Sequence, residues 1–175
     1  NTCDKIWNKK QKLTLEYMKD MVCDKNMVDF LFGLKEKGYI LACCSNSIES
    51  TVNNTLHNSG VRHLFDIVLS NNDVKKPKPN PEIYLKCMAE LGISPRETVI
   101  IEDNIVGLES AFYSGSHVIA VPNPSVNTRY IMDEIMNISK EKFTPTWTNP
   151  IHVIIPAAGL GSRFAEHYTE PKPFI

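Results

Sequence analysis

Two patterns of apolar residues alternate along the chain, one typical of buried strands and one typical of helices. Continuous apolar runs, which favour strands covered on both faces of a sheet, lie at residues 39–44, 66–70, 98–102 and 117–121. Apolar residues at helical spacing, or helix start and stop signals, mark residues 5–21, 26–37, 48–58, 80–92, 105–114 and 127–136. Strand and helix therefore alternate four times, which predicts an α/β fold with a doubly wound parallel sheet and helices on both faces.

Local signals predict where several helices begin and end. Ser47 is expected to cap the helix over residues 48–58, and Asn80-Pro81-Glu82 is a strong start for the next helix. Gly38 follows a predicted helix end, and a left-handed glycine is common at that position.

Residues 137–150 differ in character from the rest, with two prolines and several Thr and Asn residues. We interpret them as an interdomain linker; the alternative is a long surface loop inside one domain. Residues 152–156 then predict a new strand, which runs into a glycine-rich turn.

Composition excludes several function classes. The chain has 175 residues, and 19 basic against 20 acidic residues give a net charge of −1. There is no basic excess to neutralise a nucleic-acid backbone, and no apolar run approaches the roughly 20 residues of a membrane span. Five cysteines without CxxC spacing indicate thiols of a reducing, cytoplasmic compartment, with a disulfide framework or a zinc site as the alternative.

Polar side chains follow three of the predicted strands, at the edge where open α/β sheets bind ligands. They are the segments 45–47, 75–78 and 102–104. Hydroxyls, helix-start amides and a lysine suit a phosphate, and adjacent carboxylates suit Mg²⁺, which needs about six oxygen ligands. Each segment alone could also be a helix cap, a solvated loop lysine or a surface turn, and the ordered set favours a site.

Three motifs in these segments resemble a known family. CSNS at 44–47, KPNPEIY at 78–84 and VIIEDNIVGLESAFYSG at 99–115 are similar to the second, third and fourth motifs of haloacid dehalogenase-like hydrolases. The resemblance covers about residues 5–136 and is to the helical-cap subgroup, which includes phosphatases and β-phosphoglucomutase. It implies that residues 1–37 are the end of a helical cap and its return to the core, and that residues 38–136 are the core.

The resemblance also implies roles for individual residues. It places the phosphate-binding residues at Ser45, Asn46, Ser47 and Lys78. Among these, Ser45 would bind the transferring phosphoryl group and Lys78 would stabilise its charge. Asp103, helped by Glu102, would hold Mg²⁺, so Ser45, Lys78 and Asp103 are the expected catalytic residues. Gly107 matches the family pattern and is expected to be structural.

One part of the family pattern is missing. The family's nucleophile and general acid/base lie in an Asp-x-Asp motif upstream of the cap, and no such motif occurs in the 175 residues. Without that carboxylate, phosphoryl transfer loses covalent catalysis and a metal ligand. We therefore expect an N-terminally truncated fragment that is inactive alone, from an active parent.

A second resemblance begins after the linker. VIIPAAGLGSRFAEHYTEPKPFI at 153–175 is similar to the opening of sugar-phosphate nucleotidyltransferases. Gly159 and Gly161 would let backbone amides approach a nucleoside triphosphate, while Arg163 and Lys172 would offset its charge. A dinucleotide-binding start is the weaker alternative, because Phe164 stands where its third glycine belongs.

Together the motifs predict a bifunctional parent with a nucleotidyltransferase domain starting at residues 151–175. Its first domain would be a Mg²⁺-dependent phosphohydrolase for a small phosphorylated metabolite, such as a sugar phosphate. A phosphomutase of the β-phosphoglucomutase type and a non-catalytic module attached to the nucleotidyltransferase are the alternatives.

Overall fold

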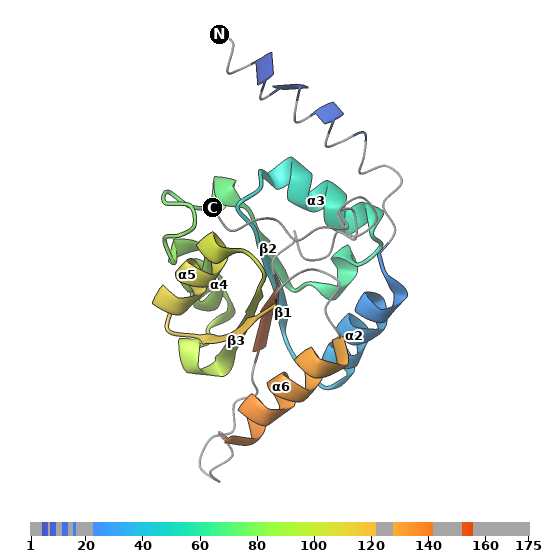
Figure 1. Ribbon diagram of the computed structural model, residues 1–175, viewed down its shortest axis with the longest axis vertical. Coiled ribbons are helices and arrows are strands. Elements are labelled where there is room, and N and C mark those ends of the chain that lie inside the picture. Colours follow the sequence, from blue (N-terminus) through green and yellow to red (C-terminus); the bar gives the residue numbers. More distant parts are fainter. Residues whose placement is uncertain are drawn as a thin grey trace.

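A five-stranded parallel sheet forms the centre of the molecule (Figure 1). The computed structural model describes residues 23–121, 128–141 and 152–155, and single residues at 5, 6, 8, 9, 12, 13 and 16. The strand order is β2-β1-β5-β3-β4. The strands are β1 (Leu41–Cys44), β2 (Ile67–Leu69), β3 (Thr98–Glu102), β4 (His117–Ala120) and β5 (His152–Ile155).

Helices pack on both faces of this sheet, as predicted. One face is covered by α2 (Lys25–Glu36), α3 (Glu49–Asn58) and α6 (Thr128–Glu141). The other face is covered by α4 (Glu82–Leu91) and α5 (Ile105–Tyr113). Each face has its own buried apolar cluster, so both sides of every central strand lie in a core. Figure 1 shows α4 and α5 on one side of the sheet and α2 and α6 on the other.

The vicinal cysteines of β1 lie on opposite faces of the sheet. Cys43 belongs to the cluster beneath α2, α3 and α6, and Cys44 belongs to the cluster beneath α4 and α5. This follows from the two-residue period of a strand. The four cysteines in the described part of the chain are all buried and form no disulfide with one another.

Strand β5 exists as predicted, but its place in the fold differs from the expected opening of a separate domain. It lies between β1 and β3 and pairs with both in parallel, Ile154 opposite Ala42 on one side and Ile100 on the other. All four of its residues are buried, because the run HVII offers apolar side chains to both cores. The domain boundaries drawn from the sequence remain predictions.

Two further details differ from expectation. The last helix, expected to end near Met136, continues to Glu141, because Ile138 extends its apolar face onto the core. Ser47 does not cap α3: Ile48 holds the cap position, and Asn72 Oδ1 accepts the Glu49 N–H at 2.9 Å from a neighbouring loop.

The helix expected over residues 5–21 is described only at single positions. These are helical, and the apolar residues Ile6 and Leu13 among them are exposed. No helix in the described part of the chain is both long and apolar enough to cross a lipid bilayer.

Candidate active site

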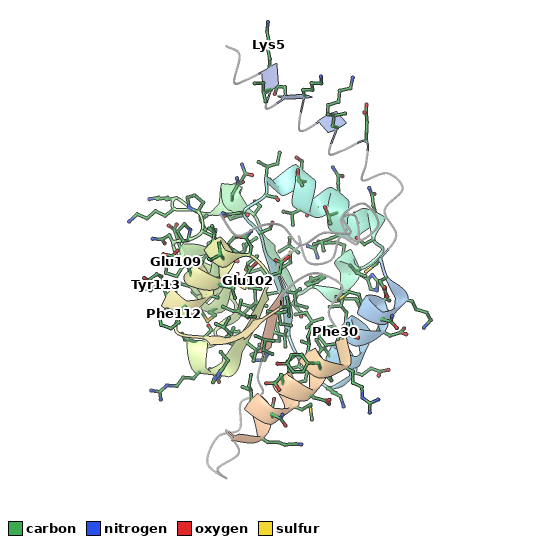
Figure 2. All side chains as sticks on the ribbon, viewed as in Figure 1. Lys5, Phe30, Glu102, Glu109, Phe112 and Tyr113 are labelled. Atoms are coloured by element: carbon green, nitrogen blue, oxygen red, sulfur yellow. The ribbon has the colours of Figure 1, made fainter. Side chains whose placement is uncertain are left out.

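Three loops place polar side chains together at the carboxyl edge of the sheet. Ser45 follows β1, Lys78 lies in the loop after β2, and Glu102 is the last residue of β3. The three side chains belong to residues that are only 5%, 8% and 2% exposed, respectively, so they lie inside the protein surface. Figure 2 shows Glu102 in the interior, whereas Phe112 and Tyr113 of α5 lie at the periphery.

A buried ion pair with a tyrosine forms the centre of this site. Lys78 Nζ lies 2.9 Å from Glu102 Oε2, 2.6 Å from the Tyr84 hydroxyl and 3.1 Å from the Cys44 carbonyl oxygen. The Tyr84 hydroxyl also donates to Glu102 Oε2 at 2.8 Å. An ammonium has three N–H donors, and these three acceptors use all of them. The lysine therefore holds Glu102 in one position while its own charge is compensated.

Because the cluster of Lys78, Tyr84 and Glu102 is buried, each member depends on the other two for its hydrogen bonds or its charge partner. Removing one member of a buried ion pair leaves an uncompensated charge, which costs about 3–5 kcal/mol. Burial, followed by the negative charge of Glu102, raises the pKa of Tyr84 far above its ordinary value. The tyrosine therefore stays protonated and remains a hydrogen-bond donor to the carboxylate.

Asn46 links the first loop to the second. Its Oδ1 accepts the backbone N–H of Lys78 at 2.9 Å, and its Nδ2 donates to the carbonyl oxygen of the same residue at 3.2 Å. The predicted phosphate-binding side chain thus contacts the lysine's backbone. Asn46 sets the position from which the Lys78 side chain enters the site.

The serines of the first loop interact with each other. Ser45 Oγ accepts the backbone N–H of Ser47 at 3.1 Å, and the Ser45 N–H donates to the Leu69 carbonyl oxygen at 2.9 Å. Because Ser45 Oγ acts as an acceptor here, its own hydroxyl proton is directed elsewhere. It has no acceptor among the residues that the structure describes, so it can donate to a bound oxyanion.

The implied metal ligands, Glu102 and Asp103, fit Mg²⁺ in part. Glu102 Oε2 is occupied by Lys78 and Tyr84, and its Oε1 accepts the N–H groups of Asp103 and Asn104, each at 3.3 Å. Burial and the neighbouring Glu102 raise the pKa of Asp103, so a cation beside this pair would be favoured. Across the described ranges, no three His, Cys, Asp or Glu side chains are grouped to hold a metal. Asp103 would supply one ligand, and most of the shell would come from water or other groups.

Gly107 allows α5 to approach the buried carboxylate. A Cβ atom at this position would lie 2.1 Å from Glu102 Cδ and 2.6 Å from its Cγ, far inside contact distance. Asn104 begins the helix by accepting the Val106 N–H at 2.9 Å. The family-pattern glycine is therefore structural in a specific way, since its missing side chain is the space that Glu102 fills.

The structure brings together most of the residues singled out from the sequence, and it adds one. Hydrogen bonds join Lys78 to Asn46 and to Glu102, and Ser45 precedes Asn46 in the first loop. The expected nucleotide-binding residues lie outside the described residues: Gly159, Gly161, Arg163 and Lys172. Tyr84 was part of the KPNPEIY motif but was not assigned a role. Its signal was an aromatic residue with a hydroxyl in the first turn of a helix directly after Lys78.

Curated relatives of this chain are named as phosphatases. It is 32% identical over 104 residues to the putative phosphatase YhcW of Bacillus subtilis, covering 59% of this chain and 47% of that protein. It is 32% identical over 103 residues to the pyrophosphatase PpaX of Bacillus velezensis, covering 58% of this chain and 48% of that protein. The chain thus spans about half the length of these relatives.

Solved structures share the fold. A HAD-superfamily hydrolase of subfamily IA from Geobacter sulfurreducens is 29% identical with a TM-score of 0.57, covering 63% of this chain and 60% of that one. A β-phosphoglucomutase from Clostridium difficile has a TM-score of 0.63 at 19% identity, covering 73% and 62%, which shows likeness of fold alone. The family profile described as haloacid dehalogenase-like hydrolase matches residues 3–121, more than half of the chain. The chain therefore belongs to the haloacid dehalogenase-like hydrolase family.

Proposed function

We propose that this chain supplies the phosphate-binding and metal-binding side of a Mg²⁺-dependent phosphohydrolase site for a small phosphorylated metabolite, such as a sugar phosphate. The observation that carries the proposal is the convergence of Ser45, the buried Lys78–Glu102 pair and Asp103 at one edge of the sheet. Relatives named as phosphatases support the reaction class. A relative named hexitol phosphatase B in Escherichia coli, 28% identical over 112 residues, supports the substrate class.

In the proposed reaction, an aspartate carboxylate attacks phosphorus, the alcohol leaves, and water then cleaves the acyl phosphate. That aspartate is not provided by an Asp-x-Asp motif in these residues, so we assign it to a segment upstream of them. The Ser45 hydroxyl and the amides beside it would donate to phosphoryl oxygens. Mg²⁺, held by Asp103, would offset phosphate charge when bound.

Lys78 has a specific part in this proposal. Because all three of its N–H donors are used, a phosphoryl oxygen could be contacted only in exchange for one present acceptor. Of the three acceptors, the Cys44 carbonyl oxygen is uncharged and lies at the end of β1, directly before Ser45. An exchange there would keep the ion pair with Glu102 intact.

Phosphate binding tests the proposal directly. Inorganic phosphate is titrated into the 175-residue chain with MgCl₂ and followed by calorimetry. We expect saturable binding that Ser45→Ala weakens by about tenfold to a hundredfold, because a hydrogen bond to a charged group contributes about 1.5–3 kcal/mol. Ser50→Ala, an exposed serine on α3, is the matched control. Absence of saturable binding, or equal binding by Ser45→Ala, would overturn the proposal.

A release assay tests the need for the upstream aspartate. We expect the 175-residue chain to release no phosphate from sugar phosphates in the presence of Mg²⁺. Measurable release that is abolished by Ser45→Ala would show that the nucleophile lies within this chain, and the upstream assignment would be wrong.

We also propose, from the resemblance of residues 153–175, that the parent protein carries a nucleotidyltransferase domain that uses a nucleoside triphosphate. The position of β5 within the hydrolase sheet makes this testable. If β5 belongs to a separate domain, residues 1–141 alone will unfold with the same midpoint as the full chain. A lower midpoint for residues 1–141 would show that β5 completes the hydrolase core and would contradict a domain start there.

A further inference from the structure

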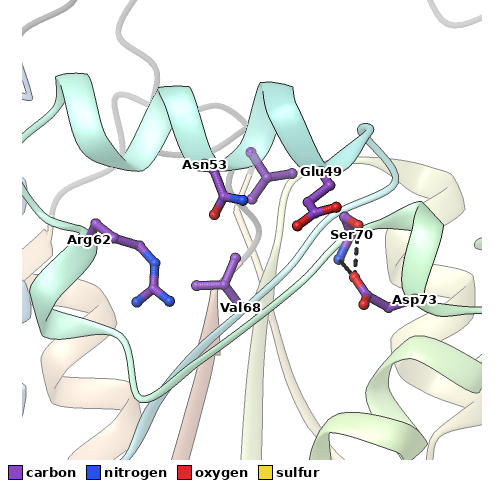
Figure 3. Close-up of a pocket in the computed structure, with 7 residues that line it drawn as sticks. Glu49, Asn53, Arg62, Val68, Ser70 and Asp73 are labelled. Carbon is purple, nitrogen blue, oxygen red and sulfur yellow. Dashed lines mark hydrogen bonds between the residues drawn. The ribbon is translucent and has the colours of Figure 1, made fainter.

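A hollow lies outside the candidate active site, between α3 and the edge strand β2 (Figure 3). Its volume is about 180 Å³, room for about six water-sized groups. The valines Val52 and Val68 contribute apolar walls, and the remaining lining residues are polar: Glu49, Asn53, Arg62, Ser70 and Asp73. A small organic molecule is therefore within its capacity.

Opposite charges line the two ends of this pocket. Figure 3 shows Arg62 at one end, Glu49 and Asp73 at the other, and Asn53 between them. Arg62 and Glu49 form no salt bridge in the described structure, although both face the same hollow. A cation already lies beside Asp73, because Lys86 Nζ donates to the Asp73 backbone carbonyl oxygen at 2.8 Å. Neither Glu49 nor Arg62 is in a salt bridge with another described residue.

Several polar side chains of the pocket still have hydrogen-bond donors or acceptors that no described residue uses. Arg62 uses Nη1 to donate to the Phe65 carbonyl oxygen at 3.0 Å, which leaves other guanidinium donors of its planar fork. Asp73 Oδ2 accepts from the Ser70 N–H and hydroxyl, each at 2.7 Å, which holds this carboxylate in place. Among the described residues, the side chains of Glu49 and Asn53 have no hydrogen-bond partner.

We propose that this pocket binds a small zwitterion, with its anionic group at Arg62 and its ammonium group between Glu49 and Asp73. A guanidinium fork matches a carboxylate, and two carboxylates match an ammonium with several N–H donors. Asn53 lies where it can contact the middle of the ligand, and the valines cover its methylene groups. The chemical class is that of short amino acids whose two charges are separated by a few carbon atoms.

The pocket lies apart from the loop of residues 45–47, and a backbone hydrogen bond links the two. The Asn71 N–H, next to Ser70, donates to the Ser47 carbonyl oxygen at 3.0 Å. Glu49 lies two residues after Ser47, and its backbone N–H donates to Asn72 Oδ1. The two sites thus share a backbone segment but no side chain, so their ligands can be tested independently.

The probes are glycine, β-alanine and 4-aminobutanoate, titrated into the 175-residue chain by calorimetry or NMR. We expect saturable binding by at least one of them, with acetate and ethylammonium binding at least fivefold more weakly. Glu49→Gln and Arg62→Gln should each weaken binding about fivefold, which corresponds to one partly exposed ion pair. Glu36→Gln and Arg96→Gln, both exposed and neither a lining residue of the pocket, should leave binding unchanged.

Two further controls keep the test decisive. Ser45→Ala should not alter zwitterion binding, which separates this site from phosphate binding. Circular dichroism of each variant checks that the fold is intact, and Glu49→Gln suffices if Arg62→Gln unfolds. Absence of saturation by all three probes, equal binding of acetate, or equal binding by Glu49→Gln would overturn the proposal.

Discussion

Replacing Gly107 by alanine should destabilise the protein by displacing the buried Glu102 carboxylate. The new Cβ would lie 2.1 Å from Glu102 Cδ and 2.3 Å from its Oε2, so the carboxylate would have to move away from Lys78 and Tyr84. Breaking a buried ion pair costs about 3–5 kcal/mol, whereas alanine gains about 1 kcal/mol over glycine in a helix. The expected net loss in the free energy of unfolding is about 2–4 kcal/mol.

Urea unfolding followed by circular dichroism measures this loss. With a urea dependence of about 2 kcal/mol per molar, the middle of the usual range, the midpoint should fall by about 1–2 M. Gly33→Ala in α2 is the matched control, because a Cβ there meets only Met132 Cε at 3.7 Å. It should leave stability unchanged or raise it by up to about 1 kcal/mol.

A double mutant decides the cause. In a Glu102→Ala background the carboxylate is gone, so adding Gly107→Ala should stabilise the protein by about 1 kcal/mol instead of destabilising it. If Gly107→Ala is as stable as the wild type, or if its cost persists without the Glu102 side chain, the assignment of Gly107 as space for this carboxylate is refuted.

Three further predictions concern other contacts. Tyr84→Phe leaves Lys78 and Glu102 short of a hydrogen bond, so urea unfolding should show a loss of about 1–3 kcal/mol. Burial opposes ionisation of Asp66, but bonds from Lys35 and from a backbone N–H of β1 outweigh it and lower its pKa. Its stabilisation is thus present above about pH 4 and lost as pH falls through the lowered value, and Asp66→Asn should flatten that loss. The four buried cysteines should react with a thiol reagent only on unfolding.

Each of these has a contrary outcome. Unchanged stability of Tyr84→Phe would mean that water or a shift of the lysine replaces the hydroxyl. Equal acid sensitivity of wild type and Asp66→Asn would show that other carboxylates cause the acid loss. Fast thiol reaction of a Cys3→Ala variant in the native state would place these four cysteines on a surface, because Cys3 lies outside the described residues.

Most of the elements could be predicted because their signals are local. The runs around β1 and β3 are apolar on both sides of the strand, and Gly38 and Gly92 adopt the left-handed conformation that ends a helix. The cap of α3 could not be predicted in this way, since its acceptor, Asn72, comes from a loop distant in sequence.

The site was predicted as a set of segments, but its internal bonding was not. The order of motifs placed Lys78 and Glu102 at one edge of the sheet. That Tyr84 completes their hydrogen bonding depends on which side of α4 faces the sheet, where the helix packs on β1 and β2, and this is decided by packing. Likewise, the sequence predicted the strand over residues 152–156 without showing its neighbours, because strand pairing between distant segments has no local signature.

The position of β5 has a consequence for folding during synthesis. The pairs β1–β2 and β3–β4 share no direct strand pairing, and each joins the sheet only through β5. At about 5–20 residues per second, the ribosome completes residue 121 some seconds before residue 155. During that interval the nascent chain holds two half-sheets, each with an open inner edge of apolar strand. Binding of a chaperone to the nascent chain should therefore peak in this window and end once β5 has emerged.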